Sequence, residues 1–388
     1  MFKIATLNNI SAKGLIYFND KFQITDCIDD ADGILVRSAK MHDMDFSKNL
    51  KAIARAGAGV NNIPVDKCSE AGIVVFNTPG ANANAVKELV LAGLLLSSRK
   101  IVEGIDWTRT LKGKGDEVEK LVEKCKSEFT GCEIKGKTLA VIGLGAIGVM
   151  VANAASALGM NVIGYDPFIS VKSALELSRK IRLIEKLDDL LAEAHFISLH
   201  VPMVSETKYM INKEKFSKMK EGVKILNFAR GEIVDDDALI EALKLGIVDR
   251  YVTDFPNDKL LGLENVIPVP HLGASTPESE ENCAIMAVEE ISDYLENGNI
   301  TNSVNFPDCS LGICKTAGRI GVLHKNIPAM ISRITSTMGE LNINISDMNN
   351  RSKNLYAYTL VDIDSPVTDA QVEALRNVDG IIGVRVIK

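Results

Sequence analysis

The sequence predicts an α/β protein with two doubly wound parallel sheets and a smaller βαββαβ domain at its C-terminal end. Three observations support this class. Short apolar runs alternate with helical patterns over about the first 300 residues. A GxGxxG motif follows one of these runs at residues 143–148. The order then changes to strand, helix, strand, strand, helix, strand.

Composition excludes several other classes. The chain has 388 residues, 46% hydrophobic and 24% charged, which is typical of a globular protein of several domains. Its 44 Lys and Arg against 51 Asp and Glu give a net charge of −7, so it lacks the basic field of a nucleic-acid or anionic-membrane binder. No signal peptide or membrane span is apparent, since the longest apolar run is only residues 89–96.

The seven cysteines form no CxxC pair and no zinc or redox motif. Free thiols in a reducing compartment are the simplest interpretation. We therefore expect a cytoplasmic protein that binds no metal, no nucleic acid and no membrane.

The first domain is expected at residues 1–90 together with 283–302. Apolar runs at 33–37, 52–55 and 73–76 end in turn signals, as buried parallel strands do. This alternation predicts a mostly parallel α/β domain, and the family resemblance given below implies that it is flavodoxin-like and binds the substrate. A long helical pattern at 85–106 is expected to lead into the second domain, and a periodic helix at 278–297 to lead back out.

The second domain is expected at residues 91–282. Its six apolar runs are separated by helical patterns, which is the strand count of a Rossmann-type dinucleotide-binding domain. These runs are 139–142, 162–165, 196–199, 223–227, 252–253 and 266–269.

The third domain is expected at residues 315–388, after a linker at 303–314 that lacks periodicity. Its βαββαβ order is that of the ferredoxin-like fold. The predicted elements are 317–323, 327–341, 343–350, 354–363, 368–377 and 381–387.

The glycine motif is placed where a dinucleotide would bind. Gly143 allows a tight turn after the strand, Gly145 lets the backbone approach a pyrophosphate, and Gly148 lets helix and strand pack closely. Asp166 ends the next strand, 18 residues after Gly148, where a carboxylate can bind both ribose hydroxyls. Pro and Phe follow it and offer no cation for a 2′-phosphate, so NAD is favoured over NADP.

Two chemically competent side chains follow later strands of this domain. Arg230 comes after the strand at 223–227 and could bind a carboxylate through two parallel hydrogen bonds. His271 comes after the strand at 266–269 and could move a hydroxyl proton while a hydride leaves the same carbon.

The motifs GLGAIG at 143–148, LHVP at 199–202, NFARG at 227–231 and PHLGAS at 270–275 together resemble the D-isomer-specific 2-hydroxyacid dehydrogenase family. The resemblance implies that Arg230 binds the substrate carboxylate, that His271 is the acid/base, and that Asp254 lies near the nicotinamide carboxamide. The cofactor-binding residues that it implies are Gly143, Gly145, Ala146, Ile147, Gly148, Asp166, His200, Val201, Pro202, Thr207, Ala229, Asp254, His271 and Gly273.

The third catalytic residue departs from the family pattern, in which a Glu follows a Phe and orients the His. Counting from Arg230 reaches Lys259, which cannot orient an imidazolium. Aligning the Phe255-Pro256 pair with the family pattern, with one residue deleted before Phe255, reaches Asp258 instead. We favour Asp258. Its shorter side chain would require the loop to approach His271 more closely.

The N-terminal part also resembles family members that act on a phosphorylated substrate. The resemblance implies that Arg37, Ser38, Val60 and Asn82 bind the substrate, with Arg230 and His271. It implies NAD-dependent oxidation of 3-phosphoglycerate. The alternative for Arg37 is a structural ion pair.

The last domain resembles an ACT domain, a small regulatory module. His324, Asn326 and Asn344 have the spacing of the serine-binding residues in serine-regulated members of the family. Such ligands bind between two ACT domains, so the resemblance implies L-serine as an effector and a homodimer or homotetramer. The alternative is a domain kept only for assembly.

Two other functions remain open at this point. One is a glyoxylate or hydroxypyruvate reductase on the same scaffold. The other is an NAD-sensing binding protein with relaxed catalysis, which the uncertainty at Asp258 and Lys259 would favour.

Overall fold

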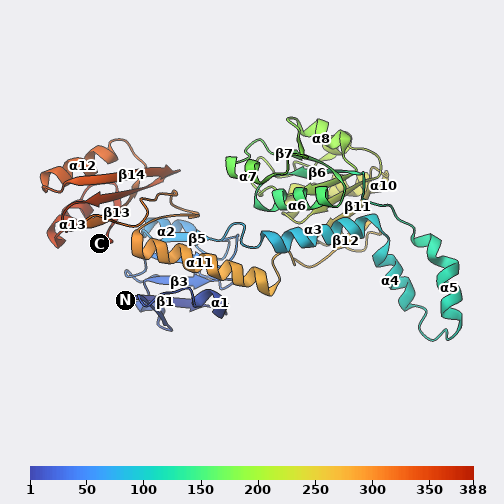
Figure 1. Cartoon of the computed structure of the whole chain (residues 1–388), viewed down its shortest axis with the longest axis horizontal. Helices are drawn as coiled ribbons and strands as arrows, with labels where there is room; N and C mark the ends of the chain where they lie inside the picture. Colours follow the sequence, from blue (N-terminus) through green and yellow to red (C-terminus); the bar gives the residue numbers. More distant parts are fainter. The chain divides into compact units, whose positions relative to one another are not determined.

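The computed structural model describes residues 1–388, which divide into two compact units (Figure 1). The first unit is Met1–Asn82 with Pro277–Lys388, and the second is Ala83–Thr276. The division falls where the long helices α3 (Ala83–Ser98) and α11 (Pro277–Asn297) begin. The expected boundaries, 90/91 and 282/283, lie inside these two helices.

The first unit begins with a five-stranded parallel sheet of order β2-β1-β3-β4-β5. This order is that of the flavodoxin-like fold, as expected. Two strands at the N-terminus extend the sheet beyond the three apolar runs that the sequence marks. The strands are β1 (Phe2–Leu7), β2 (Phe22–Thr25), β3 (Gly33–Val36), β4 (Ala52–Arg55) and β5 (Val74–Asn77), with short helices α1 (Ala12–Leu15) and α2 (Val65–Glu70).

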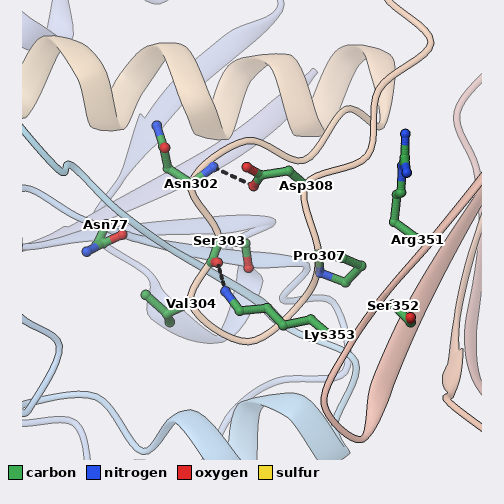
Figure 2. Close-up of a pocket in the computed structure, with 9 residues that line it drawn as sticks. All are labelled: Asn77, Asn302, Ser303, Val304, Pro307, Asp308, Arg351, Ser352 and Lys353. Atoms are coloured by element: carbon green, nitrogen blue, oxygen red, sulfur yellow. Dashed lines mark hydrogen bonds between the residues drawn. The ribbon is translucent and has the colours of Figure 1, made fainter. Parts of the chain in front are cut away.

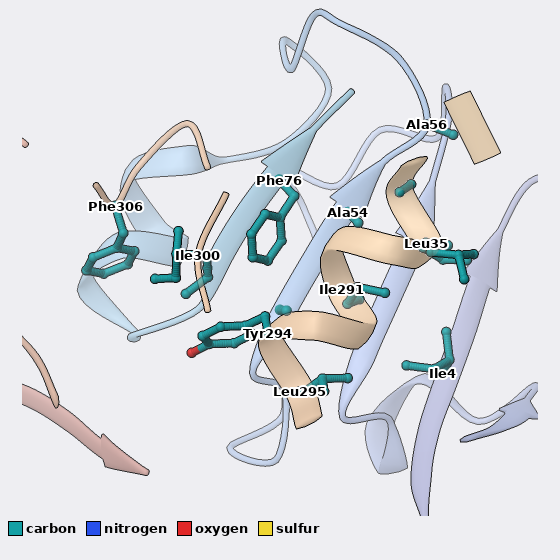
Figure 3. Packing of buried hydrophobic residues seen from close by; sticks show 14 of the residues in the cluster. Ile4, Leu35, Ala54, Ala56, Phe76, Ile291, Tyr294, Leu295, Ile300 and Phe306 are labelled. Carbon is teal, nitrogen blue, oxygen red and sulfur yellow. The ribbon is translucent and has the colours of Figure 1, made fainter. Parts of the chain in front are cut away.

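Helix α11 packs across this sheet and forms its core (Figure 3). The ring of Tyr294 lies 5.7 Å from that of Phe76 between ring centroids, and both side chains are fully buried. The same core continues into the C-terminal domain through Leu323, Tyr358 and Leu360. Because these apolar side chains share one core, the C-terminal domain is packed against the sheet domain of its own chain.

The C-terminal domain is a four-stranded antiparallel sheet of order β14-β15-β13-β16 with two helices, the ferredoxin-like arrangement expected of an ACT domain. Each element lies within a few residues of its prediction. They are β13 (Gly318–Lys325), α12 (Met330–Glu340), β14 (Ile345–Lys353), β15 (Tyr356–Ile363), α13 (Asp369–Arg376) and β16 (Ile381–Val386).

The second unit is a seven-stranded parallel sheet of order β12-β11-β10-β9-β6-β7-β8. The strand order reverses between β6 and β9, and ligands bind at such a switch point. The strands are β6 (Thr138–Ile142), β7 (Asn161–Tyr165), β8 (Arg182–Leu183), β9 (Phe196–Leu199), β10 (Val223–Asn227), β11 (Val248–Thr253) and β12 (Val266–Pro268). The longer helices of this unit, after α3, are α4 (Ile101–Arg109), α5 (Glu117–Cys125), α6 (Ala146–Ala157), α8 (Leu187–Glu193) and α10 (Asp236–Lys244).

The single helix expected at 85–106 is wrong, because α3 ends at Ser98 and α4 begins at Ile101. The hydroxyls of Ser97 and Ser98 both donate to the carbonyl of Leu94, an alternative to helical bonding that serine favours. The carbonyl of Ser98 accepts from the N–H of Cys132 and is therefore engaged outside the helix.

All seven cysteines are unpaired. No cluster of three or more His, Cys, Asp or Glu side chains is arranged to hold a metal ion. None of the helices has both the length and the apolar character that crossing a bilayer requires.

Candidate active site

The glycine turn after β6 has room for a ligand at one position only. Gly143 has φ +90°, and a Cβ there would lie 2.6 Å from the carbonyl oxygen of His200. A Cβ on Gly148 would lie 1.9 Å from the carbonyl oxygen of Gly143. A Cβ on Gly145 would meet nothing within 4 Å. The protein itself therefore requires Gly143 and Gly148, whereas the open space beside Gly145 fits a pyrophosphate at the N-terminus of α6.

Asp166 is held against this turn. Its Oδ2 accepts from the N–H of Leu144 and its Oδ1 from the N–H of Phe168, both at 2.8 Å. These bonds fix an acceptor group where the ribose of a dinucleotide would lie. The donor set at this turn therefore fits NAD.

The segment after β9 forms the opposite side of the switch point. The His200 Nε2 lies 2.8 Å from the Ser198 hydroxyl, and burial lowers the pKa of this imidazole to about 4, so it is neutral at physiological pH. The Thr207 hydroxyl donates to the Pro202 carbonyl and accepts from the N–H of Val204. The predicted residues Pro202 and Thr207 thus share one closed turn, and His200, which precedes it, lies beside Gly143 of the glycine motif.

The loop that carries Arg230 is fixed by a buried amide that sequence reasoning missed. The Asn227 amide donates to the Arg230 carbonyl at 2.9 Å and to the Tyr251 hydroxyl at 3.0 Å. Its oxygen accepts from the N–H of Ala229 at 3.2 Å. An Asn at the end of a buried strand was the available signal, because a buried amide needs partners.

Two of the predicted catalytic side chains, Arg230 and His271, both lie against the ring of Phe255. Its ring centroid lies 4.6 Å from that of the His271 imidazole and 5.8 Å from the guanidinium carbon of Arg230. Both polar side chains remain exposed. The second unit therefore holds Arg230 and His271 against one aromatic ring. One guanidinium nitrogen of Arg230 donates to the Ala229 carbonyl at 2.6 Å, and its remaining donors are open to a small acid.

Asp254 immediately precedes Phe255 and interacts electrostatically with both His271 and Arg230. Its side chain is 1% exposed, and neither carboxylate oxygen has a hydrogen-bond partner. Burial raises the pKa of Asp254, and the nearby charge of His271 opposes the rise in smaller measure. A buried acceptor without a partner is costly, so this position fits a ligand that brings a donor, such as a carboxamide N–H.

No carboxylate is hydrogen-bonded to His271. Asp258 is exposed and makes neither a hydrogen bond nor an ion pair with the imidazole. Lys259 pairs with Asp237 at 2.7 Å. The role of Asp258 therefore stays a prediction, and Asp254 is the carboxylate whose charge interacts with His271.

In the first unit, the predicted substrate residues follow strands β3 and β5. The Arg37 guanidinium lies 2.8 Å from a carboxylate oxygen of Glu280. Arg37 therefore forms the ion pair that was the alternative to substrate binding. Both side chains are about 40% exposed (37% and 42%), and an exposed pair contributes only ~0–1 kcal/mol. Such a pair can be exchanged for a substrate anion. The N–H of Ser38 donates to Asn8, while Val60 and Asn82 are half-buried.

The three predicted effector residues do not meet in one copy of the ACT domain. His324 is 2% exposed, with its nitrogens 2.9 Å from the Lys325 carbonyl and from the Thr359 hydroxyl. Asn326 follows the last residue of β13, whereas Asn344 precedes the first residue of β14. These strands run in the same direction, so the two amides lie at opposite ends of the sheet. Asn326 lies beside Leu355 and Asn344 beside Asp364, which are roughly 30 Å apart along β15 at about 3.3 Å per residue.

Comparison with known proteins agrees with this geometry. Residues 91–273 match the family described as D-isomer specific 2-hydroxyacid dehydrogenase, NAD binding domain. The chain is 41% identical over 285 residues to the hydroxypyruvate reductase of Thermotoga maritima, covering 70% of this chain and 87% of that protein. The chain belongs to the D-isomer-specific 2-hydroxyacid dehydrogenase family. It thus has the NAD-binding domain of an oxidoreductase family that acts on CH–OH groups.

Other relatives of the family are D-3-phosphoglycerate dehydrogenases. That of Methanocaldococcus jannaschii is 38% identical over 308 residues, covering 76% of this chain and 56% of the relative. The chain thus spans about half the length of this relative and of its counterpart in Archaeoglobus fulgidus (52%). A solved NAD+-bound 3-phosphoglycerate dehydrogenase from Entamoeba histolytica has a TM-score of 0.60 and 30% identity, covering 78% of this chain and 98% of that one.

Proposed function

We propose that this chain is a D-3-phosphoglycerate dehydrogenase, which oxidises 3-phosphoglycerate to 3-phosphohydroxypyruvate with NAD. The observation that carries the proposal is the placement of Arg230 and His271 against Phe255, near the partnerless carboxylate of Asp254. Arg37 supports the phosphorylated substrate, because its exposed ion pair can be replaced by a phosphate.

The residues divide the chemistry between them. NAD, when bound, supplies the hydride acceptor. Arg230 binds the substrate carboxylate through two parallel hydrogen bonds and fixes the orientation of the C2 carbon. His271 accepts the proton of the C2 hydroxyl as the hydride leaves, and the negative charge of Asp254 stabilises the imidazolium that forms.

Three observations favour other functions. The Thermotoga maritima relative, matched over 87% of its length, is a hydroxypyruvate reductase, and Arg37 is paired with Glu280 in this structure. This favours reduction of an unphosphorylated acid as the second candidate. The lack of a carboxylate hydrogen-bonded to His271 favours, more weakly, a binding protein that senses NAD.

The test is oxidation of NADH by phosphohydroxypyruvate, hydroxypyruvate and glyoxylate, followed by absorbance. We expect phosphohydroxypyruvate to be preferred. Arg37→Gln should lower kcat/KM for it by about tenfold or more, since a charge-assisted contact is lost, and leave hydroxypyruvate nearly unchanged. Glu280→Gln is the matched control, because it frees Arg37 without removing it.

Each other result has a definite meaning. Preference for hydroxypyruvate, with no effect of Arg37→Gln, would establish the reductase. Turnover of none of these acids, together with NADH binding detected by fluorescence, would establish the sensor.

L-serine inhibition through His324, Asn326 and Asn344 is part of this proposal. Because Asn326 and Asn344 lie at opposite ends of the sheet, a site with all three needs the sheet of a second copy. The chain should therefore be a homodimer or homotetramer in light scattering, and Asn326→Ala should weaken inhibition by serine without changing kcat. A monomer that serine still inhibits would contradict the shared site.

A further inference from the structure

A pocket of about 510 Å³ lies within the first unit, between the 302–308 segment and strand β14 of the ACT domain (Figure 2). This volume is in the usual range for small-molecule sites. None of the residues that we predict to bind substrate, NAD or serine lines this pocket. The pocket is therefore separate from those sites.

Strand β14 presents two cations to the pocket. Residues 349, 351 and 353 share one face of the strand, because side chains alternate. Asn349 donates to the Ser310 carbonyl at 3.0 Å, and the Lys353 ammonium donates to the Ser303 carbonyl at 2.8 Å. Arg351 lies between these two anchors and makes no hydrogen bond or ion pair of its own. Its guanidinium is left free for a ligand.

The other side of the pocket carries one carboxylate. One oxygen of Asp308 accepts from the N–H of Asn302 at 2.9 Å, as Figure 2 shows, and Asp308 is in no ion pair. The backbone of Asn302 is in the left-handed region, with φ +58°, and its side-chain amide donates to Glu290 at 2.7 Å. These bonds hold Asp308 at the pocket. The pocket therefore offers two positive charges and one negative charge on fixed elements.

We propose that this pocket binds an α-amino acid with an acidic side chain. Such a molecule has two anionic groups and one ammonium, which match Arg351, Lys353 and Asp308 in number and sign. A plain dianion leaves Asp308 facing negative charge, and an amino acid with a neutral side chain leaves one cation unpaired. Dicarboxylic and O-phosphorylated amino acids share the required chemistry.

The pocket is connected to the predicted substrate turn. Asn77 lines it, and the N–H of Asn77 donates to the Asn302 carbonyl at 3.4 Å. The Asn77 side chain donates to the carbonyl of Ala58, in the turn that carries Val60. We expect a bound ligand to change KM through this connection. That expectation rests on the proposed function, whereas binding itself does not.

The test is isothermal titration calorimetry of the full chain with four ligands. L-glutamate represents the dicarboxylic amino acids and O-phospho-L-serine the O-phosphorylated ones. The ligand that binds more tightly identifies the acidic group that the pocket prefers. L-glutamine removes the second anion and glutarate removes the ammonium, so each should bind about tenfold more weakly than L-glutamate or not at all. Equal binding of glutarate and L-glutamate would overturn the role of Asp308.

Variants locate the binding. Because the Arg351 side chain is exposed, the Arg351→Gln variant should fold normally. It should nevertheless weaken binding of the better ligand by about tenfold or more. Arg333→Gln, an exposed arginine on α12, is the matched control and should have no effect. Binding of neither amino acid at millimolar concentration, or binding unaffected by Arg351→Gln, would overturn the proposal. Because calorimetry needs no turnover, failure of the proposed reaction would leave this result readable.

Discussion

Two buried aspartates illustrate the difference between the two units. In the second unit, Asp254 is 1% exposed and has no hydrogen-bond partner. In the ACT domain, Asp362 is 7% exposed and receives two hydrogen bonds from the fully buried guanidinium of Arg319. Arg319 also donates to the carbonyls of Asn297 and Gly312, so it joins α11, the linker and the ACT sheet.

The comparison separates a group that supports the fold from one that awaits a ligand. A buried charge that is fully paired contributes to a unique structure, and removal of its partner is costly. A buried carboxylate that accepts no hydrogen bond lowers stability and is kept only where something else compensates. The four predictions below test this distinction, and they run from the largest expected effect to the smallest.

The largest expected effect is on kcat, at the proposed acid/base His271. His271→Asn should lower kcat by about 10²–10⁴-fold, because it removes the group that accepts the hydroxyl proton. Since His271 is exposed, the free energy of unfolding should change by no more than about 0.5 kcal/mol. Steady-state kinetics and urea unfolding measure the two quantities. A large loss of stability would place His271 among the structural groups.

The opposite pattern is expected at the paired site. Arg319→Met should lower the free energy of unfolding by about 3–5 kcal/mol, because Asp362 then keeps an uncompensated buried charge. Urea unfolding followed by circular dichroism measures this loss. Arg333→Met, which breaks an exposed pair with Asp379, should cost less than about 1 kcal/mol. Equal losses in the two variants would remove the distinction.

Glu290 on α11 is intermediate, since only one of its oxygens has a partner. Burial raises the pKa of Glu290 to about 8 in the folded chain, against 4.5 for the free group. The folded state therefore holds a proton that the unfolded state releases, and stability falls as pH rises from about 4.5 to 8.

Glu290→Gln removes this dependence. It should be neutral at pH 4 and stabilise the chain by about 4 kcal/mol at pH 8, as measured by denaturation at both values. Glu340→Gln, an exposed carboxylate on α12, is the control. A stability gain that is the same at pH 4 and pH 8 would contradict the buried titration.

The smallest effect is expected at Asp254. Burial raises the pKa of this carboxyl, so its charged form destabilises the fold as pH rises. Asp254→Asn should therefore raise the free energy of unfolding by about 1 kcal/mol at pH 8 and by less at pH 5. The same variant should weaken NADH binding by about tenfold, because a charged acceptor for the carboxamide is lost. Unchanged NADH binding would mean that Asp254 awaits no such ligand.

The alternation of apolar runs was sufficient to predict the two parallel sheets, and it predicted the ACT elements within a few residues. Local pattern could not show the break between α3 and α4, because it depends on the bond from Cys132 to Ser98, more than thirty residues away. Nor could residue spacing show that Asn326 and Asn344 lie at opposite sheet ends, since spacing does not record strand direction.

In the candidate site, the residues at strand ends could be predicted from the sequence, whereas the position of a loop residue could not. Motifs placed Arg230, His271 and Asp254 at neighbouring strand ends, where the sheet order brings them together. The position of Asp258 depends on how its loop folds. Asn257 in that loop donates a hydrogen bond to Asp236, and Lys259 donates one to Asp237. These contacts with α10 cannot be predicted from a local alignment.

The three glycines of the turn after β6 also bear on how sequence variants of this protein should be interpreted. At Gly143 and Gly148 any side chain collides with backbone, so a substitution there would be detected as misfolded protein. At Gly145 the backbone φ is −75° and a methyl group meets nothing. A Gly145→Ala allele should therefore express and melt like the parent protein and still lose activity, because the methyl group would occupy the space in which the pyrophosphate of NAD binds.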